Sequence, residues 1–202
     1  MAFLSTIGVM GLIALVRGLI RWPDEAAGRR ILWWTIVSFV AHLAFGLIVS
    51  NAGSAARAYL ATDSVTYHQV ASALSDHWKN GSPMPFIPSG KEGFYYLLAS
   101  LYWVFGKYAA AGLAVNAFCA AALVPIMSDT TRRLFGVAAA RYAAPLVVLL
   151  PGMFLWTSQL MKEAGMLILL AVALNCAVRL VDRMSPDPLI LLTFSLIFAL
   201  TF

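Results

Sequence analysis

Charged residues are scarce in this sequence. They make up 11% of the 202 residues, whereas soluble globular domains carry about 25%. Hydrophobic residues make up 61%, which excludes a soluble enzyme, a disordered tail and a secreted disulfide scaffold. Six membrane spans of about 20 residues would use roughly 120 positions, close to this apolar share. The sequence therefore predicts an all-α, polytopic transmembrane bundle of about five or six spans.

Several kinds of site are also missing from the sequence. It contains no glycine-rich phosphate loop, no His-Glu-x-x-His pattern and no Gly-x-Ser-x-Gly pattern. Its two cysteines, Cys119 and Cys176, lie in apolar runs, which favours packing over a disulfide or a metal site. His68 and His77 lack zinc-site spacing. The net charge of +5 comes from scattered residues at the ends of apolar runs, which indicates membrane flanks and no nucleic-acid partner.

The chain divides into three regions by the order of its apolar runs. Residues 1–30 form a span or an interfacial helix followed by a cytoplasmic loop. Residues 31–183 form the membrane core, and residues 184–202 start a further, apparently truncated span, which favours a fragment of a longer membrane protein. The apolar runs are 2–20, 31–50, 108–127, 137–156, 161–181 and 188–202. Pro145 and Pro151 are expected to kink or shorten one of them.

The distribution of basic residues predicts the orientation of the spans. With alternating spans, nine arginines gather on one side, and five basic residues, four of them lysines, gather on the other. Because cytoplasmic loops are enriched in basic residues, the arginine-rich side is expected to be cytoplasmic. The long loop 51–107 then faces out from a bacterial-type inner (plasma) membrane.

The long outer loop contains two expected interfacial segments. A helix is predicted to start at Asp63 as its N-cap. Its apolar positions recur at helical spacing and are expected to lie on the membrane: Tyr67, Val70, Ala71, Leu74 and Trp78. Residues 94–105 are too short to span, and Gly106-Lys107 ends them, so they are expected to lie at the interface or to re-enter.

A charged side chain beside the hydrocarbon core of a membrane raises the free energy of the protein unless water or an opposite charge contacts it. The presence of such a side chain therefore requires an explanation. The simpler interpretation of Asp63 is that it only caps the helix. Lys91-Glu92 is equally well explained as a surface pair in a loop. Lys162-Glu163 is explained as an anchor at the end of a span, although only the lysine gains from that role. These five charges are the candidate functional residues of the outer side.

The order of several short patterns resembles a known family. An Asp-x-x-x-Tyr-x-x-x-Ala frame starts at Asp63, and a Tyr-Tyr-Leu-Leu-Ala segment follows at 95–99. Phe-Gly at 105–106, Arg-Arg-Leu-Phe-Gly at 132–136, and a Pro-x-x-x-x-Trp-x-Ser frame at 151–158 come next, with Lys162-Glu163 just beyond. Over residues 31–181 this order resembles the N-terminal half of a GT-C superfamily glycosyltransferase, the membrane type that includes protein mannosyltransferases and aminoarabinose transferases.

The resemblance implies transfer of a sugar from a polyprenyl-phosphate carrier to an acceptor on the outer face. Asp63 matches the family's loop acid, which acts as base or helps to bind a metal, and Glu163 matches a second catalytic acid. Lys91 and Lys162 would bind the phosphate of the lipid-linked sugar, and the supporting residues would be Glu92, Tyr67 and His68. Many members carry another acid where Ser64 stands, so no metal ligand is assigned and a divalent cofactor stays open.

Two other functions compete with the transferase. A non-catalytic subunit that packs into a larger membrane complex fits the alanine-rich span and the abrupt end of the sequence. Its partners would be membrane lipids and other membrane subunits. A transporter is expected to have paired repeats with interrupted helices and charges at mid-membrane, and the predicted spans contain few such charges. The transporter is therefore the least favoured.

Overall fold

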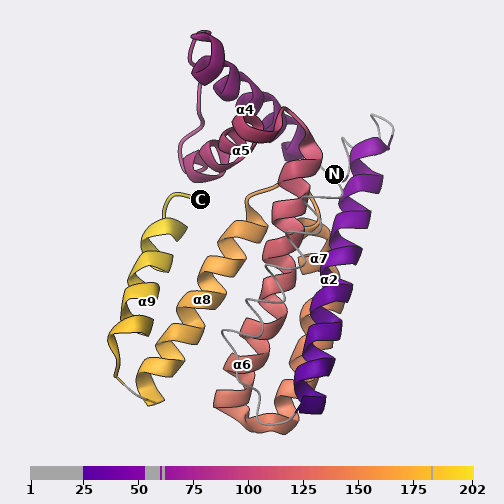
Figure 1. Ribbon diagram of the computed structural model, residues 1–202, viewed down its shortest axis with the longest axis vertical. Helices are drawn as coiled ribbons and strands as arrows, with labels where there is room; N and C mark the ends of the chain where they lie inside the picture. Colours follow the sequence, from indigo (N-terminus) through magenta and orange to yellow (C-terminus); the bar gives the residue numbers. More distant parts are fainter. Residues whose placement is uncertain (1–24, 53–59, 61, 183) are drawn as a thin grey trace.

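The computed structural model describes residues 25–52, 60, 62–182 and 184–202, and every regular element in these ranges is an α-helix. The predicted run 2–20, with Arg17, lies outside the described residues, as do Arg57 and Arg183. The helices are α2 (Glu25–Asn51), α4 (Thr62–Asn80), α5 (Glu92–Phe105), α6 (Ala109–Leu149), α7 (Pro151–Thr157), α8 (Glu163–Asp182) and α9 (Pro186–Ala199). Figure 1 shows them as a bundle with α4 and α5 across one end.

Three of these helices are long and apolar enough to cross a membrane, namely α2, α6 and α8. They have 27, 41 and 20 residues, against the roughly 20 residues that a hydrocarbon core of about 30 Å requires. Helix α9 is apolar but has 14 residues. The all-helical fold is therefore as predicted, and the described residues provide three candidate spanning helices by length and composition, against the five or six spans expected for the whole sequence.

Helix α6 turns back on itself at Gly136. This residue has φ 85° and ψ 177°, a backbone conformation that glycine adopts without a Cβ clash. Val124 before the turn and Ala144 after it pack in one cluster with Ile31 of α2. The predicted runs 108–127 and 137–156 thus correspond to two arms joined at this glycine.

The second arm of α6 ends where a proline was expected to interrupt it. Leu150 is extended, with φ −68° and ψ 109°, and Pro151 starts the short helix α7. Pro145 lies inside the helix without ending it. The expected interruption is therefore found at Pro151.

Small side chains allow the long helices to approach one another closely. Ala117 and Ala121 of α6 are almost fully buried against Phe39 of α2. On another side of α6, Leu123 packs with Ala171 of α8. Helix α9 runs beside α8 at the edge of the bundle (Figure 1).

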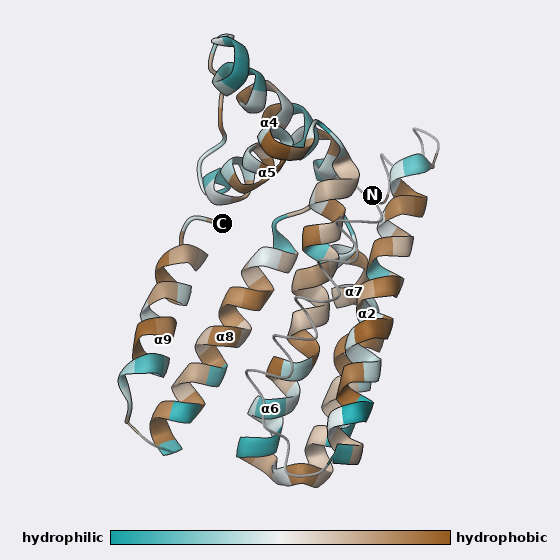
Figure 2. Ribbon diagram, in the orientation of Figure 1, coloured by the Kyte–Doolittle hydropathy of each residue, from teal (hydrophilic) through white to brown (hydrophobic). Residues whose placement is uncertain are grey.

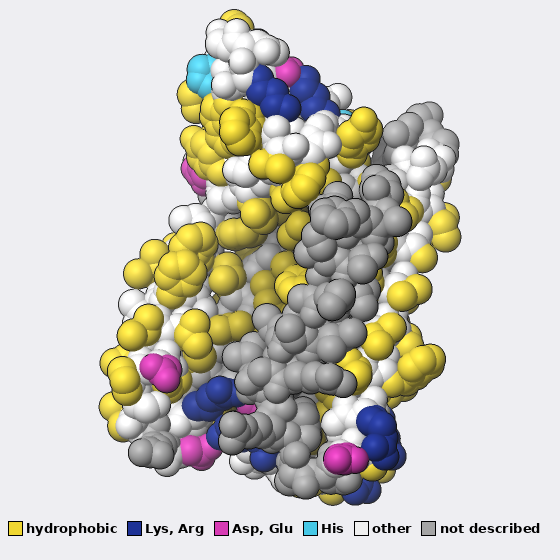
Figure 3. Space-filling model, in the orientation of Figure 1, with side chains coloured by type: hydrophobic (Ala, Val, Ile, Leu, Met, Phe, Trp, Pro, Cys, Tyr) yellow, Lys and Arg dark blue, Asp and Glu magenta, His cyan; other side chains and the backbone are white. Residues whose placement is uncertain are grey.

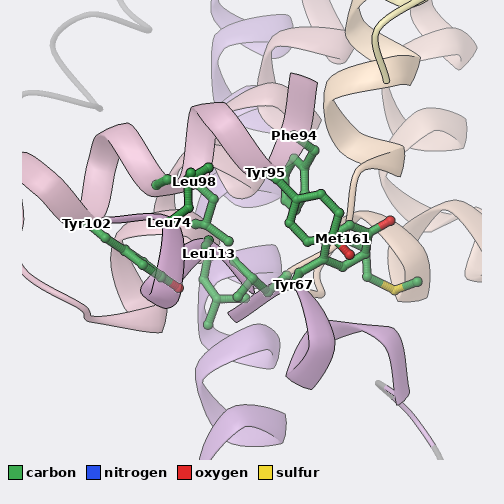
Figure 4. Packing of buried hydrophobic residues seen from close by; sticks show 11 residues of the cluster. Tyr67, Leu74, Phe94, Tyr95, Leu98, Tyr102, Leu113 and Met161 are labelled. Atoms are coloured by element: carbon green, nitrogen blue, oxygen red, sulfur yellow. The ribbon is translucent and has the colours of Figure 1, made fainter. Parts of the chain in front are cut away.

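Helices α4 and α5 pack against each other through an apolar core. Tyr67 and Leu74 of α4 are buried with Tyr95 and Tyr102 of α5, as Figure 4 shows. Leu113 of α6 joins this core to the bundle. The expectation that the apolar face of α4 lies on the membrane is therefore wrong at its centre, because α5 covers it. The short apolar segment 94–105 is a helix that ends before Gly106, as predicted.

Charged residues gather at the two ends of the bundle, leaving apolar helix surface between them (Figures 2 and 3). The first end carries all four lysines of the sequence, and we call it the lysine end: Lys79, Lys91, Lys107 and Lys162. At the opposite end α2 starts, α6 turns and α8 finishes. We call it the arginine end, after its described arginines: Arg29, Arg30, Arg132, Arg133, Arg141 and Arg179.

Candidate functional site

Charged residues from the beginnings of α4 and α5 meet at the lysine end. The Nζ atom of Lys91 lies 3.7 Å from Oδ2 of Asp63 and 5.3 Å from the centroid of the Tyr67 ring. Helix α4 begins at Thr62, so Asp63 lies in its first turn instead of at the predicted N-cap. The side chains of Asp63 and Lys91 are 53% and 35% exposed, so water or a ligand reaches both.

Tyr67 is the buried centre of this arrangement. Its ring lies edge-on to Phe94 at 4.9 Å and tilted against Tyr95 at 5.0 Å, measured between ring centroids. Burial raises the pKa of the Tyr67 hydroxyl, and the nearby groups Glu163, Tyr95 and Asp63 raise it further. The hydroxyl therefore keeps its proton and is a hydrogen-bond donor among acidic neighbours.

Glu163 joins the cluster from the first turn of α8. The charge of the Glu163 carboxylate contributes to the raised pKa of Tyr67. Its Oε2 atom is buried and accepts no hydrogen bond from the described residues. A buried polar atom without a partner is unusual in native structures and calls for an explanation, such as a ligand or an ion. Lys162, next to Glu163, donates from Nζ to the carbonyl oxygen of Gly90 at 3.1 Å. Both candidate lysines therefore lie at the start of α5.

A buried asparagine positions the start of α8. Asn116 of α6 donates from Nδ2 to the carbonyl oxygens of Gln159 and Met161, the second at 2.8 Å. Met161 in turn packs in the core that contains Tyr67 (Figure 4). Asn116 was not predicted as a functional residue from the sequence. A lone amide in an alanine-rich span is nevertheless a detectable signal, because a polar side chain there needs a partner on another helix.

The start of α5 is held by the end of the described chain. The backbone N–H of Gly93 donates to the carbonyl oxygen of Thr201 at 2.7 Å, and a Cβ at residue 93 would collide with Thr201. Glu92 uses its Oε2 atom to accept the backbone N–H of Lys91 at 2.9 Å. Glu92 therefore shapes the local backbone around Lys91.

His68 lies on a different side of α4 from the Lys91 contact. Its Nδ1 atom is 2.8 Å from the Tyr102 hydroxyl, and it lines a cavity of about 190 Å³ with Ser64 and Gln159, among others. Burial lowers the pKa of the His68 imidazole, and the charge of Lys107 lowers it further. Of the three predicted supporting residues, Tyr67 and Glu92 contact or adjoin Lys91, and His68 belongs to this separate cavity.

The described residues contain no group of three or more His, Cys, Asp or Glu side chains that could hold a metal ion. The two candidate acids are Asp63 and Glu163, and a cation such as Mg²⁺ is usually held by one or two carboxylates together with substrate phosphates and water. No site built from protein ligands alone is assigned at the lysine end.

The arginine end contains a second cluster, which the sequence analysis did not single out. The side chain of Asp129 is 2% exposed and pairs with Arg132 at 2.6 Å, Arg133 at 3.0 Å and Arg179 at 3.1 Å. Asn175 of α8 also donates to Asp129, at 3.1 Å. The signal was present, because two of the arginines follow Asp129 at the i+3 and i+4 positions of a helix.

Comparison with known protein families, with curated proteins and with solved structures finds no match to this chain. The two ends are therefore compared by the accessibility of their charged groups. At the lysine end an acid and an ammonium group are accessible, and a third charged side chain has an oxygen without a partner among the described residues. At the arginine end the acid is enclosed by its partners. The lysine end is the better candidate for chemistry.

Proposed function

We propose that this chain is the N-terminal half of a GT-C type membrane glycosyltransferase, which moves a sugar from a polyprenyl-phosphate donor to an extracytoplasmic acceptor. The observation that carries the proposal is the accessible Lys91 ammonium group between the carboxylate of Asp63 and the ring of Tyr67, at one end of an apolar bundle. Glycosyl transfer from a lipid phosphate needs a base and a cation side by side.

The proposal includes a topology of five or six spans in a bacterial-type inner membrane. The two arms of α6 would cross separately, the second together with α7. The lysine end, including the described part of loop 51–107, would face outward, and the arginine end would lie in the cytoplasm. The separation of arginines from lysines along the bundle supports this orientation, because positive charge, mainly arginine here, is enriched on the cytoplasmic side.

In the proposed reaction Asp63 acts as the general base. Its carboxylate takes the proton of the acceptor hydroxyl while that oxygen forms a bond to the anomeric carbon of the sugar. The bond between this carbon and the phosphate oxygen breaks, and the phosphate leaves with the electron pair. Since one carboxylate acts directly, the configuration at the anomeric carbon inverts.

Lys91 and Lys162 would bind the departing phosphate. Both lie at the start of α5, where the helix dipole also favours an anion. Among the described residues Lys162 donates to a neutral carbonyl and forms no ion pair, so its charge is available to a phosphate oxygen. The cations act where negative charge develops, which is how electrostatic catalysis lowers a barrier.

Glu163 and Tyr67 would orient the sugar. The Oε2 atom of Glu163 can accept a hydrogen bond from a sugar hydroxyl, and the protonated Tyr67 hydroxyl supplies a donor beside it. No step is assigned to a metal ion.

The test uses membranes that contain the full-length protein and a panel of labelled polyprenyl-phosphate-linked hexoses and pentoses. Release of polyprenyl phosphate is measured, with the acceptors of the membrane present. Asp63→Asn should lower the rate about 100-fold or more, the usual contribution of a general base. Asp76→Asn is the matched control, since Asp76 lies on the same helix but pairs with Lys107. Equal rates for the Asp63 variant and the wild type would overturn the proposal.

The alternative is a non-catalytic transmembrane subunit. Ser64 favours it, because it stands where many members of the family that the chain resembles carry a second acid. If the wild-type protein releases no polyprenyl phosphate from any donor in the panel, and co-purifies in fixed ratio with other membrane proteins, the subunit replaces the transferase.

A further inference from the structure

A cavity of about 190 Å³ lies at the lysine end, between the end of α2, the start of α4 and the start of α6. Its apolar lining includes Val49, Val65 and Leu113. Its polar lining comes from Ser50, Ser64, His68 and Gln159, and no described residue of the lining is an acid, a lysine or an arginine. The charged groups assigned to the donor therefore lie outside this cavity.

Gln159 is a buried amide in this lining. It is 3% exposed, and its side chain has no hydrogen-bond partner among the described residues. Its backbone is held on two sides, because its carbonyl oxygen accepts a hydrogen bond from Asn116, and a Cβ at Gly46 would collide with the carbonyl oxygen of Ser158. Buried polar side chains are nearly always paired, so this amide indicates a polar ligand.

His68 adds a second polar group. Its Nδ1 atom is 2.8 Å from the hydroxyl of Tyr102, which is fully buried in the core of Figure 4. Among the described residues Nδ1 is the only partner of that hydroxyl, so the hydroxyl donates to it and Nε2 carries the imidazole hydrogen. Burial lowers the pKa of the imidazole, so the ring is neutral at pH 7. His68 can therefore donate to a ligand without carrying a charge.

These groups favour a small neutral ligand that carries hydroxyl groups. The Gln159 amide both donates and accepts, and the Ser50 hydroxyl, which donates to the Leu47 carbonyl at 2.9 Å, keeps its oxygen as an acceptor. A charged ligand would lose water here without meeting an opposite charge in the lining. Since an apolar cavity of about 150 Å³ binds benzene, a cavity of this size has room for one six-membered ring.

We propose that this cavity binds one neutral sugar unit of the acceptor, held by Gln159 and His68. Its assignment to the acceptor rests on the proposed function, in which the donor phosphate lies at Lys91 and Lys162. Ser64 of the lining directly follows Asp63, so a sugar in the cavity would present a hydroxyl beside the proposed general base. The sugar of the donor is the other source of such a unit, and the experiment separates the two.

The experiment measures the binding of methyl glycosides to the full-length protein in detergent by saturation-transfer NMR. Neutral hexosides and pentosides are titrated beside charged counterparts, which are the methyl glycosides of uronic acids and amino sugars. At least one neutral glycoside should bind about tenfold more tightly than its charged counterparts, because the lining offers a charge no partner. Equal affinities, or no binding of any neutral glycoside, would overturn the proposal.

Two variants locate the sugar in the cavity. Gln159→Leu removes the amide at similar volume and should weaken binding about tenfold, whereas Gln69→Leu, on the exposed side of α4 and outside the lining, should not. Val65→Phe narrows the cavity from a residue that is 41% exposed, so it also tests the site if Gln159→Leu fails to fold. Its control is Val40→Phe on the exposed side of α2. Undiminished binding in Val65→Phe would place the sugar elsewhere and contradict the proposal.

The last arm separates the acceptor from the donor, in the Asp63→Asn variant so that transfer is slow. A saturating amount of each polyprenyl-phosphate-linked sugar is added to the bound glycoside. The glycoside should stay bound, and its displacement would assign the cavity to the donor sugar and overturn the acceptor site.

Glycoside binding is measured without turnover, so the two proposals can fail separately. An active enzyme that binds no glycoside would contradict this inference alone. Glycoside binding without any release of polyprenyl phosphate would contradict the proposed function and, with it, the assignment of the cavity to the acceptor.

Discussion

Both ends of this bundle contain ion pairs, but the pairs differ in how far they are buried. At the arginine end Asp129 is almost fully buried, and three arginines and an amide surround it within 3.1 Å. At the lysine end Asp63 and Lys91 are accessible and stand 3.7 Å apart. The first arrangement uses its charges to join α6 to α8. The second leaves its charges available to a substrate, and this difference separates a structural cluster from a candidate site.

The comparison predicts its largest effect on stability at the arginine end. Asp129→Ala leaves its arginines without their buried partner, so the free energy of unfolding should fall by about 3–5 kcal/mol. Titration with sodium dodecyl sulfate in mixed micelles measures it. Asp182→Asn is the control, because the Asp182 side chain is 53% exposed and its loss should change stability by less than about 1 kcal/mol. Similar losses for both would mean that burial does not distinguish the two acids.

A second prediction concerns activity at the lysine end. Lys91→Gln should slow release of polyprenyl phosphate about 10- to 100-fold, because the phosphate loses a cation where charge develops. The free energy of unfolding should change by less than about 1 kcal/mol, as for other exposed pairs. Lys79→Gln is the control, since Lys79 contacts the Tyr102 carbonyl away from Asp63. If Lys91→Gln lowered stability as much as Asp129→Ala, the charges of the lysine end would be structural like those of the arginine end.

A smaller effect is expected from the residue that positions α8. Asn116→Leu leaves the carbonyl oxygens of Gln159 and Met161 without their buried donor, which should lower stability by about 1–2 kcal/mol. Release of polyprenyl phosphate should fall as well, because Glu163 follows directly after this segment. An active variant with lowered stability would show that the segment holds the bundle together without positioning the site.

The smallest expected effect is a dependence of stability on pH through His68. Its pKa in the folded protein is lowered from 6.5 by burial, so the unfolded chain binds more protons once the pH falls below that value. Stability should therefore decrease as the pH is lowered through 6.5 towards the folded pKa, and His68→Gln should flatten this part of the curve. Unfolding titrations at pH 7.5 and pH 5.5 compare the two proteins. An unchanged curve in the variant would assign the effect to other groups.

Much of the helical architecture follows from hydrophobic runs. The runs at 31–50 and 161–181 correspond to α2 and α8, because the length of an apolar run is enough to predict a candidate spanning helix. The packing of α4 could not be predicted in this way. Its apolar face looks the same whether lipid or another helix covers it, and only the fold brings α5 onto Tyr67.

The candidate site divides in the same manner. Asp63 and Lys91 could be singled out in the sequence because an isolated charge near a membrane requires an explanation. Their contact could not be predicted, because it depends on how the start of α5 packs beside the start of α4. Asp129 was not predicted, because the arginines beside it were already explained as the basic residues that orient a membrane protein. No acidic partner was therefore expected for them. Which acid is enclosed and which is accessible is a property of packing.

The position of the donor phosphate on the protein decides between the two ends. A polyprenyl-phosphate analogue with a photoreactive group beside the phosphate is cross-linked to the full-length protein in membranes, and the labelled peptides are mapped by mass spectrometry. If the lysine end binds the phosphate, labels are expected in the segments around Lys91 and Lys162, with a clear loss of label in the Lys91→Gln, Lys162→Gln double variant. Labels confined to the segment around Asp129 and Arg179, or unchanged in the double variant, would contradict it.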